Sequence, residues 1–239
     1  VLHEMPFEND GVISWELMVE RLNSDLANTL GNLVNRTISM TNKYFGGTVT
    51  NKGVTEEVDA DLKAVTENTP KAVEAKMNEL RVADAITEIF NLFKRCNKYI
   101  DETMPWALAK EEDKKDRLET VLWNLIQSIS EGAKLLESFM PETAEKILAQ
   151  LGGGHVVEKP EILFQRLDLE EVMKKVEELH PKVKEEKEEE EEGIDIEAKP
   201  EITFEDFEKM QFQVGEIISC EAVKKSKKLL CSIHVKDRP

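Results

Sequence analysis

Apolar residues recur at helical spacing in five stretches of the first 151 residues. The stretches are residues 24–45, 55–80, 81–103, 114–138 and 142–151, and each predicts an amphipathic helix with one apolar stripe. Gly46 and Gly47 end the first helix, and Pro70 is expected to break or kink the second near its middle. No strand pattern separates the stretches, so the expected fold class is mainly α, a five-helix bundle with short connections.

The pattern changes after the glycines at 152–154. Residues 152–168 contain one proline and several β-formers, which favours an extended segment that docks on another part of the molecule. Residues 168–187 could form a short exposed helix. Residues 169–200 are expected to be an acidic flexible linker that is too charged to bury a core. Apolar and polar residues alternate within 201–239, which predicts two strands joined by a basic turn at 224–228. Two strands are not a stable module alone, so we expect an incomplete β segment there.

Charge alters this picture in two places. The chain of 239 residues has a formal net charge of −17, which argues against a generally basic nucleic-acid binder. Residues 168–199 hold 14 acidic and six basic residues, so nearly half of the excess lies in the linker. The 30 residues between Asp25 and Glu56 contain no acid, and Arg36, Lys43 and Lys52 give them a charge of +3. This acid-free stretch makes the first helix a candidate for a binding site.

Composition also limits the cellular setting. No run of 18 apolar residues is present, and residues 1–14 lack a basic start and an apolar core, so neither a membrane span nor a signal peptide is expected. The three cysteines are far apart and form no CxxC pair, which favours a reducing cytoplasm. The first residue is Val, which suggests a fragment or a processed chain.

The acid-free helix carries a polar face opposite its leucines. Asn32 and Arg36 are four residues apart and would stand one turn apart on this face. An Asn amide and an Arg guanidinium suit the polar edges of unstacked bases. The same pattern is typical of a solvated helix face, and both interpretations remain open from the residues alone. The face comprises Asn28, Asn32, Asn35, Arg36, Ser39 and Lys43.

Two further features suit nucleic acid. Trp106 follows Pro105 between two predicted helices and is either a packing staple or a platform on which a base stacks. Trp15 and Trp123 lie within amphipathic patterns and are expected to be core or partly buried residues. A cluster of four lysines is either a phosphate-binding patch or a solvated turn: Lys224, Lys225, Lys227 and Lys228.

Catalytic and metal-binding patterns are missing from the sequence. The glycine pairs and triplets lack the partners of a phosphate-binding loop. The four histidines are scattered, and none stands beside a plausible nucleophile or metal-ligand set. We therefore expect no catalytic residue, no metal and no cofactor in this chain.

Two motifs resemble a known family at the proper distance from each other. They are NSDLANTLGNLVNR at 23–36 and NKYIDETMPWALAK at 97–110. With them the chain resembles the C-terminal half of bacterial methionyl-tRNA synthetases. The resemblance implies that residues 1–14 end the segment joining the catalytic domain and that 15–151 form the helical anticodon-binding domain. It also implies an extended return segment at 152–168, with 201–239 as the truncated start of an oligonucleotide-binding-fold (OB-fold) tRNA-binding domain.

The resemblance implies roles for single residues. Asn32 and Arg36 would hydrogen-bond anticodon bases, and Trp106 would stack on the first base. Asn28 and Lys43 lie on the same helix face and are additional candidate RNA contacts, apart from the resemblance. The implied partners are a tRNA with a CAU anticodon and the catalytic domain of the same enzyme.

The family also uses ATP and magnesium, with zinc in some members, to join methionine to tRNA in translation. The ATP-handling signatures are not found in this sequence, so we expect no catalysis by this polypeptide alone. Homodimerisation is in doubt because the C-terminal domain is truncated. The alternative function is a non-catalytic tRNA-binding cofactor or a helical interaction scaffold.

Overall fold

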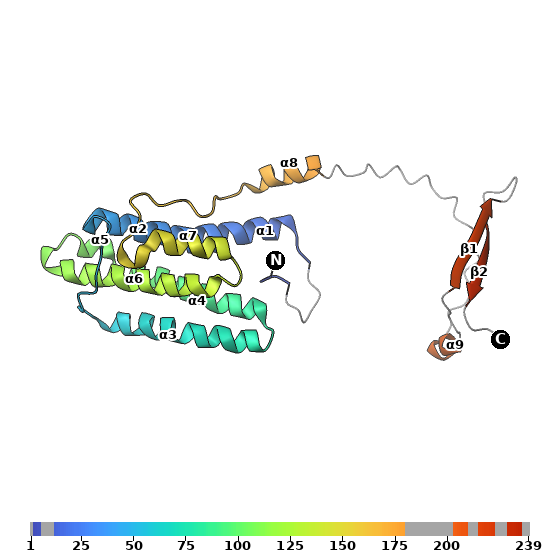
Figure 1. The fold of residues 1–239 in the computed structure, drawn as a ribbon, viewed down its shortest axis with the longest axis horizontal. Coiled ribbons are helices and arrows are strands. Elements are labelled where there is room, and N and C mark those ends of the chain that lie inside the picture. Colours follow the sequence, from blue (N-terminus) through green and yellow to red (C-terminus); the bar gives the residue numbers. More distant parts are fainter. Residues whose placement is uncertain (1, 6–11, 180–202, 210–214, 223–228, 236–239) are drawn as a thin grey trace. The chain divides into compact units, whose positions relative to one another are not determined.

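The computed structural model describes residues 2–5, 12–179, 203–209, 215–222 and 229–235. The chain divides into two compact units, Val1–Val183 and Lys184–Pro239. Helices dominate the first unit, which confirms the prediction of a mainly α fold (Figure 1). None of the helices formed by the described residues combines the length and the apolar run that a membrane span requires.

The first helical element is a long rod in three parts. It consists of α1 (Trp15–Arg21), a π-helical segment (Leu22–Gly31) and α2 (Asn32–Phe45). The predicted start at residue 24 was wrong, because the Ser14 hydroxyl caps the helix by accepting from the backbone N–H of Leu17 at 3.2 Å. Gly46 ends the rod with a left-handed φ of 61°.

The π-helical segment changes the register of the rod. At its end the backbone N–H of Asn32 donates to the carbonyl of Ala27, five residues earlier. A π-helical turn is wider than an α-turn, so the residues that follow it are rotated relative to a continuous α-helix. Periodic spacing of apolar residues did not reveal this segment.

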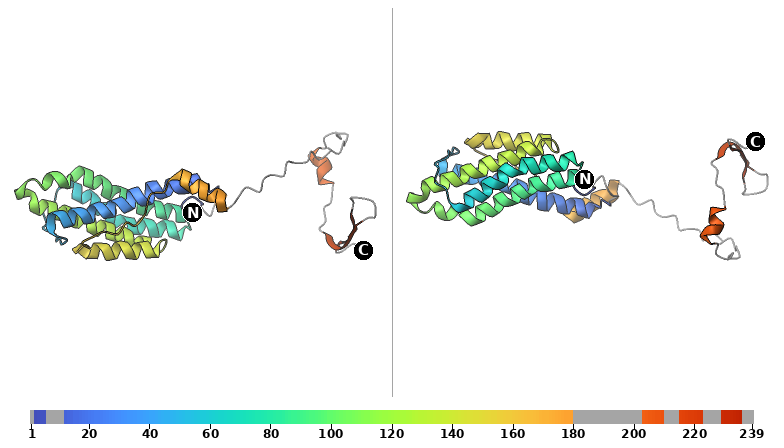
Figure 2. Two further views of the ribbon diagram at one scale, coloured as in Figure 1. Left: turned by 90° about the horizontal axis from the view of Figure 1, so that it is seen from above. Right: turned by 90° about the horizontal axis from the view of Figure 1, so that it is seen from below.

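Two long helices form the next layer. α3 (Glu57–Asn78) and α4 (Val82–Thr103) lie antiparallel and pack extensively on each other (Figure 2). The helix α3 continues through Pro70, so the expected break was wrong. Buried Leu62 and Val73 flank the proline and hold both halves of α3 in the core, which offsets the loss of one backbone hydrogen bond.

The remaining helices complete the unit. They are α5 (Pro105–Leu108), α6 (Lys115–Leu136) and α7 (Pro141–Leu151). α6 is the central helix, because it packs against α2, α3, α4 and α7. At Gly132 an added Cβ would lie 2.5 Å from Cε1 of Phe93, so glycine permits the close approach of α6 and α4.

Residues 155–168 return along the rod. The backbone N–H of Val156 donates to Gly47, and Asn42 Nδ2 donates to the carbonyls of Val157 and Glu158 at 2.9 and 3.0 Å. Asn23 exchanges two hydrogen bonds with the backbone of Leu167 near the other end of the rod. The segment is therefore fastened at both ends.

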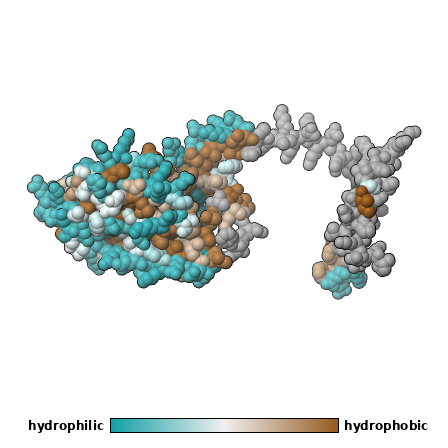
Figure 3. Space-filling view, viewed as in Figure 1, coloured by the Kyte–Doolittle hydropathy of each residue, from teal (hydrophilic) through white to brown (hydrophobic). Residues whose placement is uncertain are grey.

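The helix α8 (Leu169–Leu179) follows the return segment and packs on α1. Apolar residues gather beneath α8 on the visible face of the helical unit (Figure 3). Trp15 and Met18 of α1 and Leu169 of α8 are exposed apolar residues on these two helices. Trp15 is 45% exposed, so its expected burial was wrong: it is the first residue of α1 and lies outside the core.

The described part of the second unit contains α9 (Phe204–Glu208), β1 (Gly215–Ala222) and β2 (Leu229–Val235). The two strands pair antiparallel, with Gly215 opposite Val235 and an irregularity between Ile217 and Ser219. The two predicted strands are confirmed, while the OB-fold-like assignment stays a prediction. The basic turn at 224–228 and most of the acidic linker, 180–200, lie outside the described residues.

Candidate nucleic-acid interface

A polar hollow of about 440 Å³ lies between the rod and α4. Four of its residues come from the rod and four from α4: Asn28, Thr29, Asn32, Arg36, Lys94, Asn97, Lys98 and Asp101. The structure thus brings together Asn28, Asn32 and Arg36 of the predicted site. The hollow is not free of acids, because α4 contributes Asp101, but its lining keeps a formal charge of +2 from three bases and one acid.

The rod presents its polar residues on both sides of the change in helix type. Asn28 lies in the π-helical segment, and Asn32 is the first residue of α2. Asn32 is exposed, and its side chain makes no hydrogen bond with any other residue that the structure describes. Asn28 Oδ1 accepts a hydrogen bond at 3.2 Å from Arg166 of the return segment. Asn32 is therefore the more available of the two amides.

Arg36 lies one turn after Asn32. Its side chain is 36% exposed, and its Nη2 is 3.9 Å from Oδ1 of Asp101 on α4. A pair this long and exposed contributes little stability and leaves the guanidinium donors open to another acceptor. Arg36 can therefore present its planar guanidinium toward the hollow.

Trp106 lies on α5, immediately after the C-terminal end of α4. Met104 adopts a left-handed φ of 43° and turns the chain sharply into Pro105. Trp106 is 44% exposed, so part of its indole is accessible to solvent. The helix α5 lies at the same end of the bundle as the C-terminal end of α2, and α1 begins at the opposite end (Figures 1 and 2). An exposed indole is thus available close to the end of the rod.

The other residues of the predicted face lie outside the hollow. Ser39 donates to Asn35 at 3.2 Å, and the Nζ of exposed Lys43 lies 5.3 Å from the ring centre of Tyr44. Trp123 is half-buried, as expected, and packs on Gly154, where an added Cβ would lie 2.8 Å from its ring. Lys224, Lys225, Lys227 and Lys228 lie outside the described residues.

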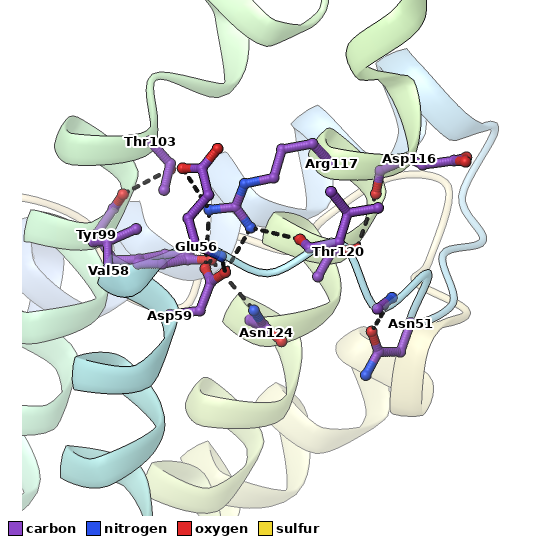
Figure 4. A network of polar contacts seen from close by, with 12 residues as sticks. Asn51, Glu56, Val58, Asp59, Tyr99, Thr103, Asp116, Arg117, Thr120 and Asn124 are labelled. Carbon is purple, nitrogen blue, oxygen red and sulfur yellow. Dashed lines mark hydrogen bonds and ion pairs between the residues drawn. The ribbon is translucent and has the colours of Figure 1, made fainter.

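A second cluster of ionisable groups is buried between α3, α4 and α6 (Figure 4). Arg117 donates to both carboxylate oxygens of Asp59 at 2.8 and 3.0 Å, and the Tyr99 hydroxyl donates to the same carboxylate. Burial alone would raise the pKa of Asp59, but the hydrogen bonds from Arg117 and Tyr99 hold that pKa below its ordinary value. Burial and the Asp59 hydrogen bond raise the pKa of Tyr99.

This cluster is a structural clamp. Asp59 also accepts from the backbone N–H of Glu56 at 2.7 Å and so caps α3, while Arg117 reaches the carbonyl of Val54. The groups satisfy one another's hydrogen bonds and are buried. They therefore hold the loop before α3 against α6.

An apolar hollow of about 420 Å³ lies where α1 begins, against α4 and the α6–α7 connection. Its walls include Leu17, Met18, Phe90, Phe139 and Met140. Across the described ranges, no group of three or more His, Cys, Asp or Glu side chains is arranged to hold a metal ion. The polar hollow differs from the apolar hollow because all eight of its lining residues carry hydrogen-bonding side chains.

Sequence reasoning missed the half of the site that α4 supplies. Lys94, Asn97, Lys98 and Asp101 follow one another at spacings of three, one and three residues and so share one side of α4. That spacing is visible in the sequence. The sequence alone does not show that this side of α4 packs beside the polar face of the rod.

Comparisons with known proteins identify the family of the chain. Residues 59–202 match the family described as the anticodon-binding domain of tRNA ligase, and residues 1–38 match the class I tRNA synthetases (M). A methionine–tRNA ligase of Clostridium acetobutylicum is 42% identical over 246 residues, and one of Caldanaerobacter subterraneus is 44% identical over 251. The match covers 96% of this chain but only 37% and 38% of those relatives.

A solved structure gives the same result. Methionyl-tRNA synthetase of Mycobacterium tuberculosis, in its free state, superposes with a TM-score of 0.66 at 32% identity. The superposition covers 70% of this chain and 37% of that one. Since the family match extends over more than half of the sequence, the chain belongs to the family of anticodon-binding domains of tRNA ligases.

Proposed function

We propose that this chain is the anticodon-reading part of a methionine–tRNA ligase. The observation that carries the proposal is the meeting of Asn32 and Arg36 in one polar hollow, at a distance of one helical turn, in a chain of this family. The relatives named above are methionine–tRNA ligases, which supports methionine tRNA, with its CAU anticodon, as the partner. The chain spans slightly more than a third of those relatives' length.

The proposed mechanism is the reading of single-stranded bases. The anticodon bases unstack, and one of them stacks on the exposed indole of Trp106. Asn32 offers a donor and an acceptor, and Arg36 offers a fork of donors, to the polar edges of the bases in the hollow. Lys94 and Lys98 at the rim supply positive charge for the phosphates that link these bases.

The whole enzyme is proposed to attach methionine to this tRNA with ATP during translation, and hence to act in the cytoplasm. The described residues are proposed to select the tRNA, and the catalytic part of the same enzyme is proposed to carry out the reaction. No residue of this chain is proposed to take part in a chemical step.

The two exposed tryptophans provide a test with a matched control. Trp106 and Trp15 are 44% and 45% exposed and lie on α5 and α1, at opposite ends of the bundle. Trp106→Ala is expected to weaken binding of a CAU anticodon stem-loop about five- to 150-fold, the equivalent of 1–3 kcal/mol of stacking. Trp15→Ala is expected to change the affinity less than twofold.

Fluorescence anisotropy with a labelled stem-loop at a fixed, physiological salt concentration measures both affinities. A loop of the same length with a scrambled anticodon reports binding that does not depend on sequence. Equal losses from the two substitutions would reject the stacking role of Trp106. Equal affinities of the wild-type chain for the CAU and scrambled loops would reject anticodon reading altogether.

A further inference from the structure

Asn97 is held more tightly than the other amides of the polar hollow. Its Nδ2 donates to the carbonyl of Thr29 in the π-helical segment at 3.0 Å and to the carbonyl of Phe93 at 3.1 Å. The first bond crosses from α4 to the rod, and the second lies within α4. Asn97 therefore joins the two walls of the hollow at the level of Asn28 and Asn32.

These two bonds fix which end of the amide faces the protein backbone. A carbonyl oxygen only accepts hydrogen bonds, so the nitrogen of the Asn97 amide must face Thr29 and Phe93. The oxygen then occupies the other end of the planar group. Within the described part of the chain, no donor forms a hydrogen bond to Oδ1 of Asn97. Asn97 lines the hollow and is half-buried, so this oxygen can accept a hydrogen bond from a ligand.

We infer that Asn97 is a further base-reading residue, whose Oδ1 accepts a hydrogen bond from the exocyclic amino group of an anticodon base. This inference rests on the proposed function. The amide cannot turn its nitrogen toward the hollow without losing both backbone bonds, so Asn97 acts as a fixed acceptor. An amino group on cytosine or adenine satisfies it, whereas the keto oxygen of uracil or hypoxanthine would place two acceptors together.

The three polar groups of the hollow then have different tasks. Toward a base in the hollow, Arg36 only donates, Asn97 only accepts, and the amide of Asn32 is free to do either. A site that combines a fixed donor with a fixed acceptor distinguishes bases by the order of these groups along their edges. Asn97 thereby adds a preference for amino bases that Asn32 and Arg36 alone do not impose.

The test compares stem-loops that differ in one amino group. In the CAU loop, cytosine is replaced by uracil or adenine by hypoxanthine, and each loop is bound to the wild-type chain and to Asn97→Ala. The wild-type chain is expected to prefer CAU over both keto loops. Asn97→Ala is expected to reduce one of these preferences about two- to tenfold, the range of a single hydrogen bond. Asn91→Ala, an exposed asparagine on α4 outside the hollow, is the matched control and should preserve both preferences.

A second measurement keeps the inference testable if Asn97→Ala does not fold. Deletion of the amino group alone, with 2-pyrimidinone for cytosine or purine for adenine, should weaken binding to the wild-type chain more than twofold in at least one case. If neither deletion does so, or if folded Asn97→Ala retains both preferences unchanged, Asn97 is no base reader. If the wild-type chain fails to distinguish CAU from a scrambled loop, the proposed function fails as well, so the two failures are distinguishable.

Discussion

The buried pair of Arg117 and Asp59 leads to a prediction about stability. Arg117→Met keeps a side chain of similar length but removes the guanidinium that donates to both oxygens of Asp59. The carboxylate then stays buried with only Tyr99 and the Glu56 backbone as donors. Removal of one partner from a buried ion pair costs about 3–5 kcal/mol of unfolding free energy.

The size of the effect makes it easy to measure. For a unit of this length, about 1 kcal/mol corresponds to a change of roughly 2–4 °C in Tm, so Arg117→Met should lower Tm by about 6–20 °C. Chemical denaturation of the full chain, followed by circular dichroism, gives the free energies directly. A second substitution, Asp59→Asn, in the Arg117→Met background should recover part of the loss because it removes the unpaired charge.

The pH dependence follows from the lowered pKa of Asp59. A carboxyl group whose pKa is lower in the folded state stabilises the fold at pH values above its unfolded pKa, about 3.9. That stabilisation is lost as the pH falls through the folded pKa. The difference between wild type and Arg117→Met should therefore be largest near pH 7 and shrink below about pH 4. A difference under 1 kcal/mol at pH 7, or one that is the same at pH 7 and pH 3, would refute the reasoning.

Three further predictions follow from packing and hydrogen bonding. Gly132→Ala should lower the unfolding free energy by about 1–3 kcal/mol, because its Cβ would overlap the Phe93 ring; a neutral result in urea denaturation would contradict that packing. Asn42→Ala removes two hydrogen bonds to the return segment and should cost about 1–3 kcal/mol and hasten cleavage of residues 155–168 in limited proteolysis. Cys96 is fully buried, and burial raises the pKa of its thiol to about 12. Peptide mapping should therefore find Cys96 unmodified by iodoacetamide at pH 8 in the native chain and modified in denaturant.

The long helices were predictable because their apolar residues repeat with helical spacing. The stripes around Leu33, Ile89 and Leu125 are buried as that spacing requires. The start of the rod was not predictable from the stripe, because Ser14 determines it through one capping bond. Pro70 was misleading because the local cost of proline is outweighed by tertiary packing on both sides.

Part of the candidate site was predictable because two of its residues are close together in the sequence. Asn32 and Arg36 share one side of a single helix, so their spacing alone placed them together. Asn97 and Asp101 join them from a helix more than 60 residues later, and only the packing of α4 on the rod reveals that pairing. The π-helical segment also escaped detection, because a change in backbone hydrogen bonding leaves no repeat in the sequence.

The most direct test of the proposed function is the affinity of Asn32→Ala and Asn35→Ala for a CAU stem-loop. Both substitutions shorten an exposed asparagine on α2, but Asn32 lines the polar hollow and Asn35 does not. Asn32→Ala should weaken binding about five- to 150-fold, as expected for a residue that reads a base edge at about 1–3 kcal/mol. Asn35→Ala should leave the affinity within twofold of wild type. Equal affinities of the two variants would contradict anticodon reading by this hollow.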